Sequence, residues 1–410
     1  MQTALAEFIK DTPAGREAES ILRKCVHCGF CTATCPTYQL LGDELDGPRG
    51  RIYLMKQALE GQPVTAKTQL HLDRCLTCRS CETTCPSGVQ YGRLLDIGRG
   101  VVNERVGRPL FDRLRRRILA FVLPRGSLFA SVLALGRVVR PMLPAALKVS
   151  VPVAVPAGPW PATQHARRMI VLAGCVQPAL APDINAAAAR VLDRIGISLV
   201  EVPGAGCCGA VRFHLDYQAD GLADMRAMID AWWSHVEAGA EAIVMTASGC
   251  GATVKEYGHL LAGDPRYAEK ARRIGALTRD LCEVIDTEVD RLAPASDTAQ
   301  IGPSVAVHSP CTLQHGQQIR GVVDRILSRV GFRLAPVPDA HLCCGSAGTY
   351  SILQPALATD LKRNKLTALQ SGLPDLIATA NIGCLVHLAS GSQTPVQHWI
   401  VALDRHLASS

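Results

Sequence analysis

The sequence predicts a multidomain α+β protein: a mostly helical, cysteine-rich first part, followed by a duplicated α/β region of parallel βαβ units. Three observations predict this fold class. Two compact cysteine motifs lie within residues 1–100. From residue 167 onward, apolar strand-like segments alternate with helical ones, which is typical of βαβ units in a parallel sheet. The same set of cysteines then occurs twice in this region.

The composition suits a cysteine-rich intracellular protein with a large core. Of the 410 residues, 48% are hydrophobic and 19% are charged, which fits two or three domains. The first residues include charged side chains and lack the apolar stretch of a secretory signal, so we expect a cytoplasmic protein. In that compartment, the 17 cysteines are more often metal ligands or catalytic groups than disulfides.

Both cysteine motifs in residues 1–100 have the spacing C-x2-C-x2-C-x3-C-P. The motifs are Cys25, Cys28, Cys31, Cys35 and Pro36, then Cys75, Cys78, Cys81, Cys85 and Pro86. Three closely spaced thiolates can wrap around one 4Fe–4S cluster, while the fourth reaches the other cluster, as in two-cluster ferredoxins. We therefore expect residues 1–100 to form a two-cluster 4Fe–4S ferredoxin-type domain. Two complete motifs argue against the alternatives, which are zinc sites and buried free thiols.

Crossed ligation of the two clusters follows from this spacing. The first cluster is expected to take Cys25, Cys28, Cys31 and Cys85, and the second Cys75, Cys78, Cys81 and Cys35. Between the motifs, residues 47–51 read GPRGR. Their glycines suit a turn, which is either solvated or turned so that its arginines face the anionic clusters.

Residues 101–166 are expected to form a basic amphipathic helical segment and a proline-rich linker. Residues 101–150 contain ten Lys and Arg against two Asp and Glu, a balance of 10 − 2 = +8, whereas the whole chain carries +7. Arginines interrupt the apolar stretches, so no run approaches the roughly 18 apolar residues of a transmembrane helix. The segment is either a solvated helix pair or a surface for an anionic membrane or a partner. Without interleaved aromatic residues, nucleic acid is not an expected partner.

The remaining chain is predicted to form two similar domains, at residues 167–290 and 300–410. The expected strands are 170–173, 197–202 and 242–246 in the first copy and 305–308, 332–337 and 376–380 in the second, and the expected helices include 185–195, 216–237 and 355–370. The cysteines of the two copies are Cys175, Cys207, Cys208 and Cys250, then Cys311, Cys343, Cys344 and Cys384. Their offsets agree: 311 − 175 = 136, 343 − 207 = 136 and 384 − 250 = 134. Because parallel strands end at one edge of a sheet, each set of four should gather in space.

The two cysteines of an adjacent pair, Cys207–Cys208 or Cys343–Cys344, can bind one metal centre only if the chain bends there. Neighbouring residues on a strand point to opposite faces, and Gly206, Gly209 and Gly345 permit such a bend. Alternatively, the two thiolates of a pair bind different metal atoms of one cluster. A vicinal disulfide and inert buried thiols are the structural alternatives.

Several other side chains are candidates for a role. Cys282 falls outside the repeat on a helical pattern and is expected in the core. His308, His315 and His341 lie near the repeated cysteines and could ligate a metal or relay protons, although a lone histidine is more often structural. No phosphate-binding glycine motif follows a predicted strand, and no nucleophile lies beside a base. We therefore expect no catalytic residue and a role in electron transfer.

These motifs together resemble the iron–sulfur subunit of bacterial glycolate oxidase (glycolate dehydrogenase). The resemblance covers nearly the whole chain and is carried by CVHCGFCTATCPTY, CLTCRSCETTCP, DGPRGRIYLMKQ, GCCGA, TASGCGA, KEYG, PCTLQH, HLCCGSAGTY and TANIGC. It identifies the two repeated domains as cysteine-rich CCG domains.

The resemblance implies a non-substrate-binding electron-transfer subunit in a hetero-oligomer with FAD-binding glycolate oxidase subunits. There glycolate, or D-lactate, is oxidised to glyoxylate or pyruvate. Electrons would pass through two 4Fe–4S clusters, and any further cluster of the CCG repeat, to a quinone-type acceptor. The expected location is peripheral, on the cytoplasmic face of the inner membrane. The alternatives are the iron–sulfur subunit of another flavin dehydrogenase, acting on glycerol 3-phosphate or lactate, and a thiol reductase like heterodisulfide reductase.

The CCG motif departs from its fullest form in both copies. In heterodisulfide reductase subunits the motif ends in C-x-x-C, whereas here Ala247 and Asn381 replace the first cysteine of that pair. Four cysteines per copy remain. Each copy is therefore expected to hold an ordinary cluster, a labile one, or none.

Overall fold

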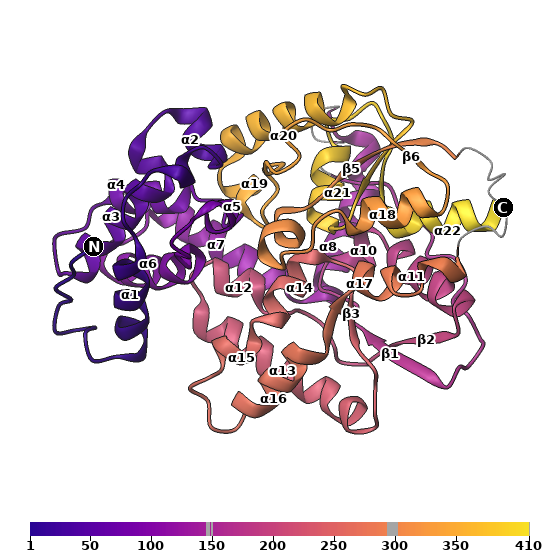
Figure 1. The fold of residues 1–410 in the computed structure, drawn as a ribbon, viewed down its shortest axis with the longest axis horizontal. Helices are drawn as coiled ribbons and strands as arrows, with labels where there is room; N and C mark the ends of the chain where they lie inside the picture. Colours follow the sequence, from indigo (N-terminus) through magenta and orange to yellow (C-terminus); the bar gives the residue numbers. More distant parts are fainter. Residues whose placement is uncertain (145–147, 149–150, 293–301, 410) are drawn as a thin grey trace. The chain divides into compact units, whose positions relative to one another are not determined.

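The computed structural model describes residues 1–144, 148, 151–292 and 302–409. Small parts of the expected segments 101–166 and 300–410 lie outside the described residues. The chain forms two compact units, whose elements are labelled in Figure 1. The first unit comprises Met1–Arg117 and His341–Leu361, and the second comprises Ile118–Ala340 and Lys362–Ser410.

The first unit is built from short helices, as predicted for residues 1–100. In chain order they are α1 (Pro13–Lys24), η1 (Phe30–Thr32), α2 (Pro36–Leu41), η2 (Glu44–Asp46), α3 (Pro48–Leu59), α4 (Ala66–Asp73), α5 (Ser80–Thr84), α6 (Tyr91–Arg105) and α19 (Tyr350–Leu353). Prolines open α1, α2 and α3, where the missing N–H costs no intrahelical hydrogen bond. The apolar faces of α1, α3 and α6 share one core, in which Leu22, Met55 and Leu94 are fully buried.

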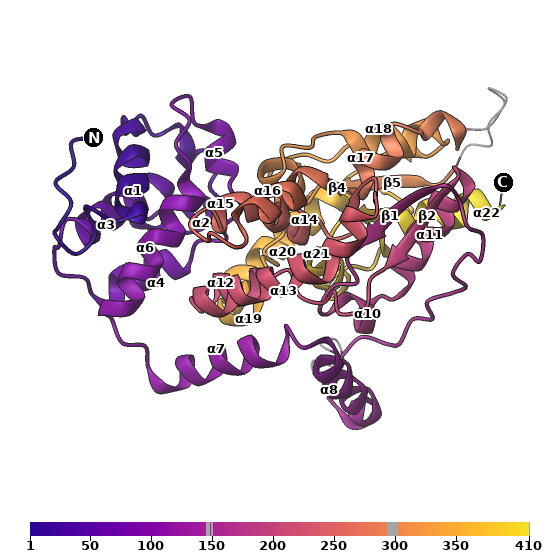
Figure 2. The ribbon, with the colours of Figure 1, turned by 90° about the horizontal axis from the view of Figure 1, so that it is seen from below.

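The basic segment forms α7 (Leu110–Val122) and α8 (Gly126–Val139), followed by η3 (Arg140–Met142). Figure 2 shows the bend between the two helices. Within the described chain, no single helix has the length and apolar character to cross a membrane; α7 and residues 126–142 meet that test only as a pair, bent by 108°. Part of the positive charge of this segment is neutralised, because Arg108 and Arg116 form ion pairs with Asp73 and Asp112.

The second unit contains, among its described residues, two four-stranded parallel sheets with the same topology. The first has the order β2-β1-β3-β4 and the second β6-β5-β7-β8. The strands are β1 (Arg167–Val171), β2 (Ile197–Glu201), β3 (Ile243–Met245), β4 (Thr278–Asp280), β5 (Ser304–His308), β6 (Arg333–Leu334), β7 (Leu376–Thr379) and β8 (Val396–His398). The predicted fold class, with its duplicated parallel βαβ region, is confirmed.

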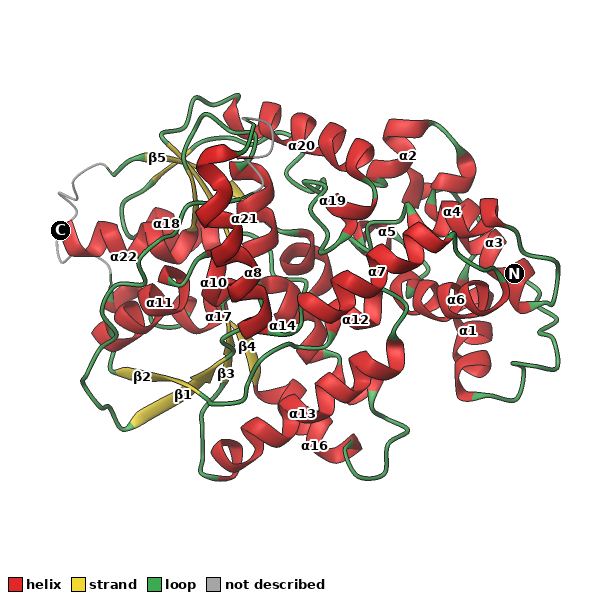
Figure 3. Cartoon of the chain, turned by 180° about the vertical axis from the view of Figure 1, so that it is seen from behind, coloured by secondary structure: helices red, strands yellow, loops and turns green. Residues whose placement is uncertain are grey.

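Helices cover both faces of the first sheet, as Figure 3 shows with α11 and α17 on one side and α13 and α16 on the other. Alternation along β1 explains this: Val171 packs with α11 and α17, whereas Ile170 faces α13 and α16. The helices of this unit are α10 (Gln177–Leu180), α11 (Asp183–Arg194), α12 (Ala210–His214), α13 (Gln218–Glu237), α14 (Ser248–Lys255), α15 (Tyr257–Leu260), α16 (Ala268–Leu277), α17 (Leu281–Asp286), η4 (Val289–Arg291), η5 (Thr312–Gly316), α18 (Val322–Arg329), α21 (Ile382–Ala389) and α22 (Trp399–Ser409), and α20 (Pro355–Gln370) begins in the first unit and ends here.

The outer strands differ from those predicted. The sequence pattern predicted three strands per copy and did not reveal β4 and β8, because three residues are too short to show an alternating pattern. It also expected a strand at 332–337, of which only Arg333–Leu334 pairs with β5.

The two copies touch where β3 and β7 end. Ser248 N donates to Ala380 O at 3.1 Å, and the Ser248 and Thr312 hydroxyls lie 2.8 Å apart. The Gly249 amide donates to the Asn381 side-chain oxygen at 3.2 Å. The cysteine-bearing strand ends at Cys250 and Cys384 are therefore joined across the repeat.

Candidate metal centres

Two recesses in the first unit are lined by the thiols of the paired motifs. The larger has an empty volume, open solvent included, of about 440 Å³. Its walls include Cys25, Cys28, Cys31 and Cys85. The second, of about 300 Å³, is lined by Cys35, Cys75, Cys78 and Cys81. These are the two groups that crossed ligation expects; their role as ligands stays a prediction. Cys81 and Tyr91 line both recesses.

Left-handed residues curl the two cysteine loops in the same way. In the first loop, φ is 56° at His27 and 87° at Gly29; in the second it is 53° at Thr77 and 60° at Arg79. The positions correspond, since 77 − 27 and 79 − 29 both equal 50. This conformation turns backbone amides toward the sulfur atoms, as the Thr77 amide does in donating to Cys75 Sγ at 3.4 Å. His27 and Arg79 are half-buried, and they line the first and the second recess respectively.

Burial keeps several of these thiols protonated in the metal-free chain. It raises the pKa of Cys31 to about 11 and also raises the pKa values of Cys25, Cys35 and Cys81. A thiol in such a site becomes a thiolate only when a cation replaces the proton. Four soft sulfur donors per recess are the ligand set that iron–sulfur clusters require. The donor chemistry therefore fits a cluster in each recess.

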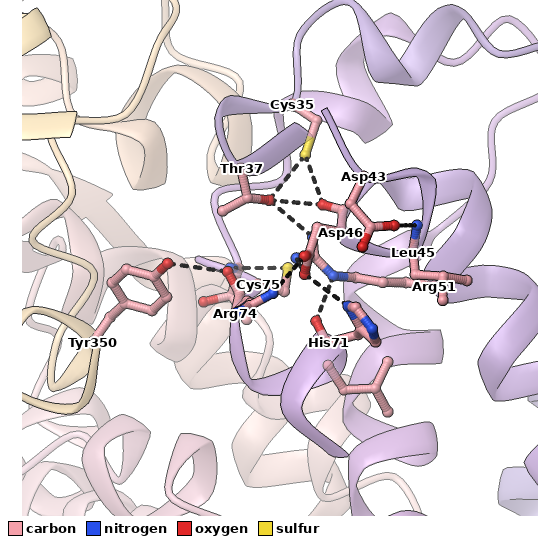
Figure 4. A network of polar contacts seen from close by, with 12 residues as sticks. Cys35, Thr37, Asp43, Leu45, Asp46, Arg51, His71, Arg74, Cys75 and Tyr350 are labelled. Atoms are coloured by element: carbon pink, nitrogen blue, oxygen red, sulfur yellow. Dashed lines mark hydrogen bonds and ion pairs between the residues drawn. The ribbon is translucent and has the colours of Figure 1, made fainter. Parts of the chain in front are cut away.

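A buried ionic network lies against the second recess (Figure 4). Arg51, fully buried, donates to His71 O at 2.7 Å, to the Thr37 hydroxyl at 3.1 Å and to Asp46 Oδ1 at 3.3 Å. Asp46 also binds Arg74 at 2.7 Å. Burial alone would lower the pKa of Arg51, but the nearby Cys75, Tyr91, Cys35 and Asp46 outweigh it and raise the pKa. A permanent positive charge thus sits beside the thiols.

The sequence pattern did not reveal most of these contacts around the thiols. It placed residues 47–51 in a turn, whereas residues 48–51 open α3 and Arg51 is in the core. Cys35 Sγ lies 3.4 Å from the Thr37 hydroxyl, and Tyr91 donates its hydroxyl to Cys75 Sγ at 3.7 Å. The only advance signal was the cluster of charges in DGPRGR, which cannot reveal burial.

The four thiols of the first CCG copy also gather at one place. Cys175 follows β1, Cys207 and Cys208 precede α12, and Cys250 lies in the first turn of α14. The sulfurs form a chain of contacts from Cys175 to Cys207, on to Cys208 and then to Cys250. Gly209, with φ of 86°, supplies the expected bend and donates its amide to Cys207 Sγ at 3.4 Å.

These contacts lower the pKa of one thiol and raise the pKa values of two others. Hydrogen bonds from Cys175 and Cys208, together with the Gly209 amide and the Arg212 charge, lower the pKa of Cys207 to about 3. The pKa values of Cys175 and Cys208 are raised, mainly by their hydrogen bonds to Cys207. A hydrogen bond to Cys250 raises that of Cys208 further, and burial raises both. A lowered pKa at one of four gathered thiols favours the binding of a cation at this site.

The cysteines of the second copy are divided between the two units. Cys343 and Cys344 belong to the first unit, and the Gly345 amide donates to Cys343 Sγ at 3.4 Å where φ is 88°. Cys311 and Cys384 belong to the second unit. Asn381, which stands where the fullest motif has cysteine, donates its amide to Cys384 Sγ at 3.6 Å.

The three candidate histidines, His308, His315 and His341, have different surroundings. His308 ends β5 and is buried, with a ring nitrogen within 4.8 Å of Cys384 Sγ. Burial and the nearby Lys365 charge lower the pKa of His308 to about 3, so its imidazole is neutral. His315 is buried in η5, and His341 is half-buried. Cys282 is fully buried in α17, which confirms that it is a core residue.

Models of two protein families match the cysteine-rich parts of the chain. A family model described as a 4Fe-4S dicluster domain matches residues 21–89, and one described as a cysteine-rich domain matches residues 169–255 and 305–389. The glycolate oxidase iron-sulfur subunit of Escherichia coli (strain K12) is 56% identical over 409 residues, which is 99% of either chain. This chain belongs to the family of glycolate oxidase iron–sulfur subunits.

Other members and relatives are more distant. A Bacillus subtilis (strain 168) protein named probable glycolate oxidase iron-sulfur subunit is 29% identical over 92% of this chain and 90% of its own. Lactate utilization protein A of Geobacillus kaustophilus is 28% identical over 50% of this chain and 83% of its own. As a glycolate oxidase iron–sulfur subunit with a dicluster domain, the chain is an iron–sulfur protein, and its cysteine recesses are the places to seek the clusters.

Proposed function

We propose that the chain transfers electrons within a glycolate-oxidising complex. It accepts them from an FAD-binding subunit, where glycolate, or D-lactate, is oxidised to glyoxylate or pyruvate, and passes them toward a quinone-type acceptor. The observation that carries this proposal is the pair of four-thiol recesses with Cys81 and Tyr91 in common, in a chain 56% identical to a glycolate oxidase iron-sulfur subunit.

We assign one 4Fe–4S cluster to Cys25, Cys28, Cys31 and Cys85, and the other to Cys75, Cys78, Cys81 and Cys35. The grouping of thiols around the two recesses supports this assignment. Ligands crossing between the loops would hold the clusters at a short, fixed separation. When bound, each cluster supplies one-electron transfer.

The chain's own residues would hold and tune these clusters. The left-handed loop residues aim amides at sulfur, and Tyr91 adds a hydroxyl donor to Cys75. Arg51 places a buried positive charge beside the second recess. Donors and positive charge both stabilise the more negative, reduced cluster, so they raise its reduction potential.

The first CCG copy is proposed as a further cluster site, with ligands Cys175, Cys207, Cys208 and Cys250. The second copy would use Cys311, Cys343, Cys344 and Cys384.

We keep the division into domains at 1–100, 101–166, 167–290 and 300–410, which the residues matched by the family models support. Residues 341–361 of the last domain pack in the first compact unit.

We propose that α8 brings the chain to the cytoplasmic face of the inner membrane. The exposed apolar face of α8, defined here as Val132, Leu135, Val138 and Val139, extends to Met142. The helix begins beside the first CCG site, where a Cβ on Gly126 would lie 3.1 Å from Cys175 O. Electrons leaving that site would emerge at the first turn of the helix that carries this apolar face, which suits a membrane-dissolved quinone.

The test is glycolate-dependent reduction of a quinone analogue by the complex co-expressed with its FAD-binding subunits. Cys28→Ser should abolish quinone reduction while glycolate still reduces the flavin, because only the relay is broken. Cys282→Ala, at a core cysteine outside every proposed site, is the control and should retain activity. Glycolate oxidation by the isolated chain, or undiminished quinone reduction in Cys28→Ser, would contradict the proposal.

Cys207 supports a second candidate function. Hydrogen bonds from Cys175 and Cys208 lower the pKa of Cys207, and a thiol of lowered pKa beside two further thiols is the arrangement of a disulfide-reducing site. A thiol reductase would reduce a model disulfide when the chain is supplied with a low-potential electron donor, and would lose this activity in Cys207→Ser. Absence of disulfide reduction would leave the relay function alone.

A further inference from the structure

The two CCG copies differ at buried positions next to their cysteines. The offset that aligns Cys311 with Cys175 also aligns His308 with Leu172, since 308 − 172 = 136. It likewise aligns Lys365 with Ile229, since 365 − 229 = 136. Each of these four side chains is at most 3% exposed. Two positions that hold apolar side chains in the first copy thus hold ionisable side chains in the second.

The sheet pairing extends this difference to a third position. In the second copy, His308 pairs with Thr379 across β5 and β7. In the first copy, Val171 pairs with Val244, so the next residues, Leu172 and Met245, are the corresponding neighbours. Leu172, Met245 and Ile229 belong to one apolar core cluster. In the second copy, the polar side chains of His308, Thr379 and Lys365 stand at these three positions.

Such a replacement is costly unless the polar atoms find partners. His308 Nδ1 lies 3.3 Å from the Thr379 hydroxyl, whereas Nε2 is buried without a hydrogen-bond partner in the described part of the chain. A ring nitrogen of His308 also lies within 4.8 Å of Cys384 Sγ. An imidazole with one nitrogen oriented by a hydroxyl, the other nitrogen unpartnered, and a thiol close to the ring has the arrangement of a metal-ligating histidine.

Lys365 lies close to His308 and bears on the kind of group that this site can hold. Its Nζ is buried and donates to Asp339 O at 3.0 Å and to Ala340 O at 3.1 Å. Its charge acts on His308. A lysine side chain in this position suits an anionic occupant, such as a thiolate-ligated cluster, better than a bare cation.

We propose that His308 is a nitrogen ligand, through Nε2, of the iron–sulfur centre of the second CCG domain, with Cys384 as a sulfur ligand. This deepens the proposed function and rests on its assignment of a cluster to that domain. The first CCG site, with Leu172 in place of histidine, would be ligated by thiolates alone. Imidazole in place of thiolate raises the potential of an iron–sulfur centre. Electrons entering the repeat would therefore settle on the second centre.

The test is pulsed EPR on the full chain in its complex, purified anaerobically from cells fed ¹⁵N-histidine. We expect a strong ¹⁵N hyperfine coupling to a reduced cluster in the wild type. The coupling should disappear in His308→Leu, which copies the first domain, and in His308→Cys, which should retain iron. His398→Gln is the matched control and should keep the coupling, because His398 is equally buried but binds Thr246 O at 2.9 Å.

The outcomes separate this inference from the function on which it rests. More than about eight irons per chain, the content of two 4Fe–4S clusters, without ¹⁵N coupling in the wild type would overturn the role of His308 and leave the CCG clusters standing. About eight irons and no coupling would overturn both. Coupling that persists in His308→Leu would assign the nitrogen to another histidine. The wild-type measurement decides the proposal even if a variant fails to fold.

Discussion

At the scale of single residues, the structure distinguishes cysteines that can hold a cluster from side chains that tune it. Arg51 and Tyr91 are both buried. Arg51 donates to the Thr37 hydroxyl, and Tyr91 donates to Cys75 Sγ. Neither is a ligand type for an iron–sulfur cluster. Their effect is electrostatic, so it should be visible in a reduction potential more than in iron content.

Tyr91 offers the sharpest residue-scale prediction. Tyr91→Phe removes the hydroxyl donor to Cys75 Sγ, so the cluster in the second recess should become harder to reduce, by tens of millivolts, with its iron retained. EPR-monitored redox titration measures this shift. Tyr350→Phe is the matched control, because that hydroxyl donates to the backbone oxygen of Arg74 at 3.1 Å. Equal potentials in wild type and Tyr91→Phe would show that the hydroxyl does not tune the cluster.

At the scale of elements, α17 carries a buried acid at its N-cap. Asp280 accepts a hydrogen bond from the Cys282 amide at 3.2 Å, and burial raises its pKa to about 6. Between about pH 4 and pH 6 the folded chain therefore holds a proton that the unfolded chain has released. Stability falls as pH rises through this window, by about 3 kcal/mol in all.

Asp280→Asn should remove this penalty and keep the helix cap, because asparagine is an equally good N-cap residue. The variant should melt at a higher temperature than the wild type at pH 7.5, and the difference should shrink toward pH 5. Thermal unfolding across that range measures it. Asp286→Asn, at a partly exposed carboxylate paired with Arg325, is the control. A difference that is the same at both pH values would refute the buried-acid account.

The exposed apolar face of α8 supports a second element-scale prediction. Leu135→Asp places a charge on a side chain that is 66% exposed, so folding should be little affected. Removing one buried leucine from a membrane contact costs about 1.5–3 kcal/mol, or roughly tenfold or more in binding. Co-sedimentation of the complex with anionic vesicles measures the loss. Leu373→Asp, at an exposed leucine outside this face, should bind like the wild type.

At the scale of the whole molecule, the first unit should depend on its metals more than the second. Its loops converge on eight thiols, whereas the second unit has extensive apolar cores on the sheet faces. Because ligand binding energy is also folding energy, removing iron should open the first unit selectively. Limited proteolysis of chelated chain should cut first within residues 1–117, and rebuilding with iron and sulfide should restore protection. Simultaneous cleavage in both units would argue against this dependence.

Some features of the whole molecule could be predicted from the sequence, and others could not. The cysteine motifs, the duplication and the inner strands were predictable, because local spacing and period determine them. The strands β4 and β8 were not, since three residues have no readable period. Arg51 was indistinguishable from a surface arginine until packing placed Asp46 and Thr37 around it. The packing of Cys343 and Cys344 in the first unit depends on tertiary contacts that no spacing encodes.

Asn381 has a consequence for electron tunnelling. Its side-chain oxygen accepts from the Gly249 amide, next to Cys250, and its side-chain amide donates to Cys384 Sγ. A short series of covalent and hydrogen bonds therefore connects a thiol of each copy. Tunnelling through bonds decays more slowly with distance than tunnelling through gaps. The asparagine that replaces a cysteine of the fullest motif would thus serve as the electronic bridge between the two halves of the repeat.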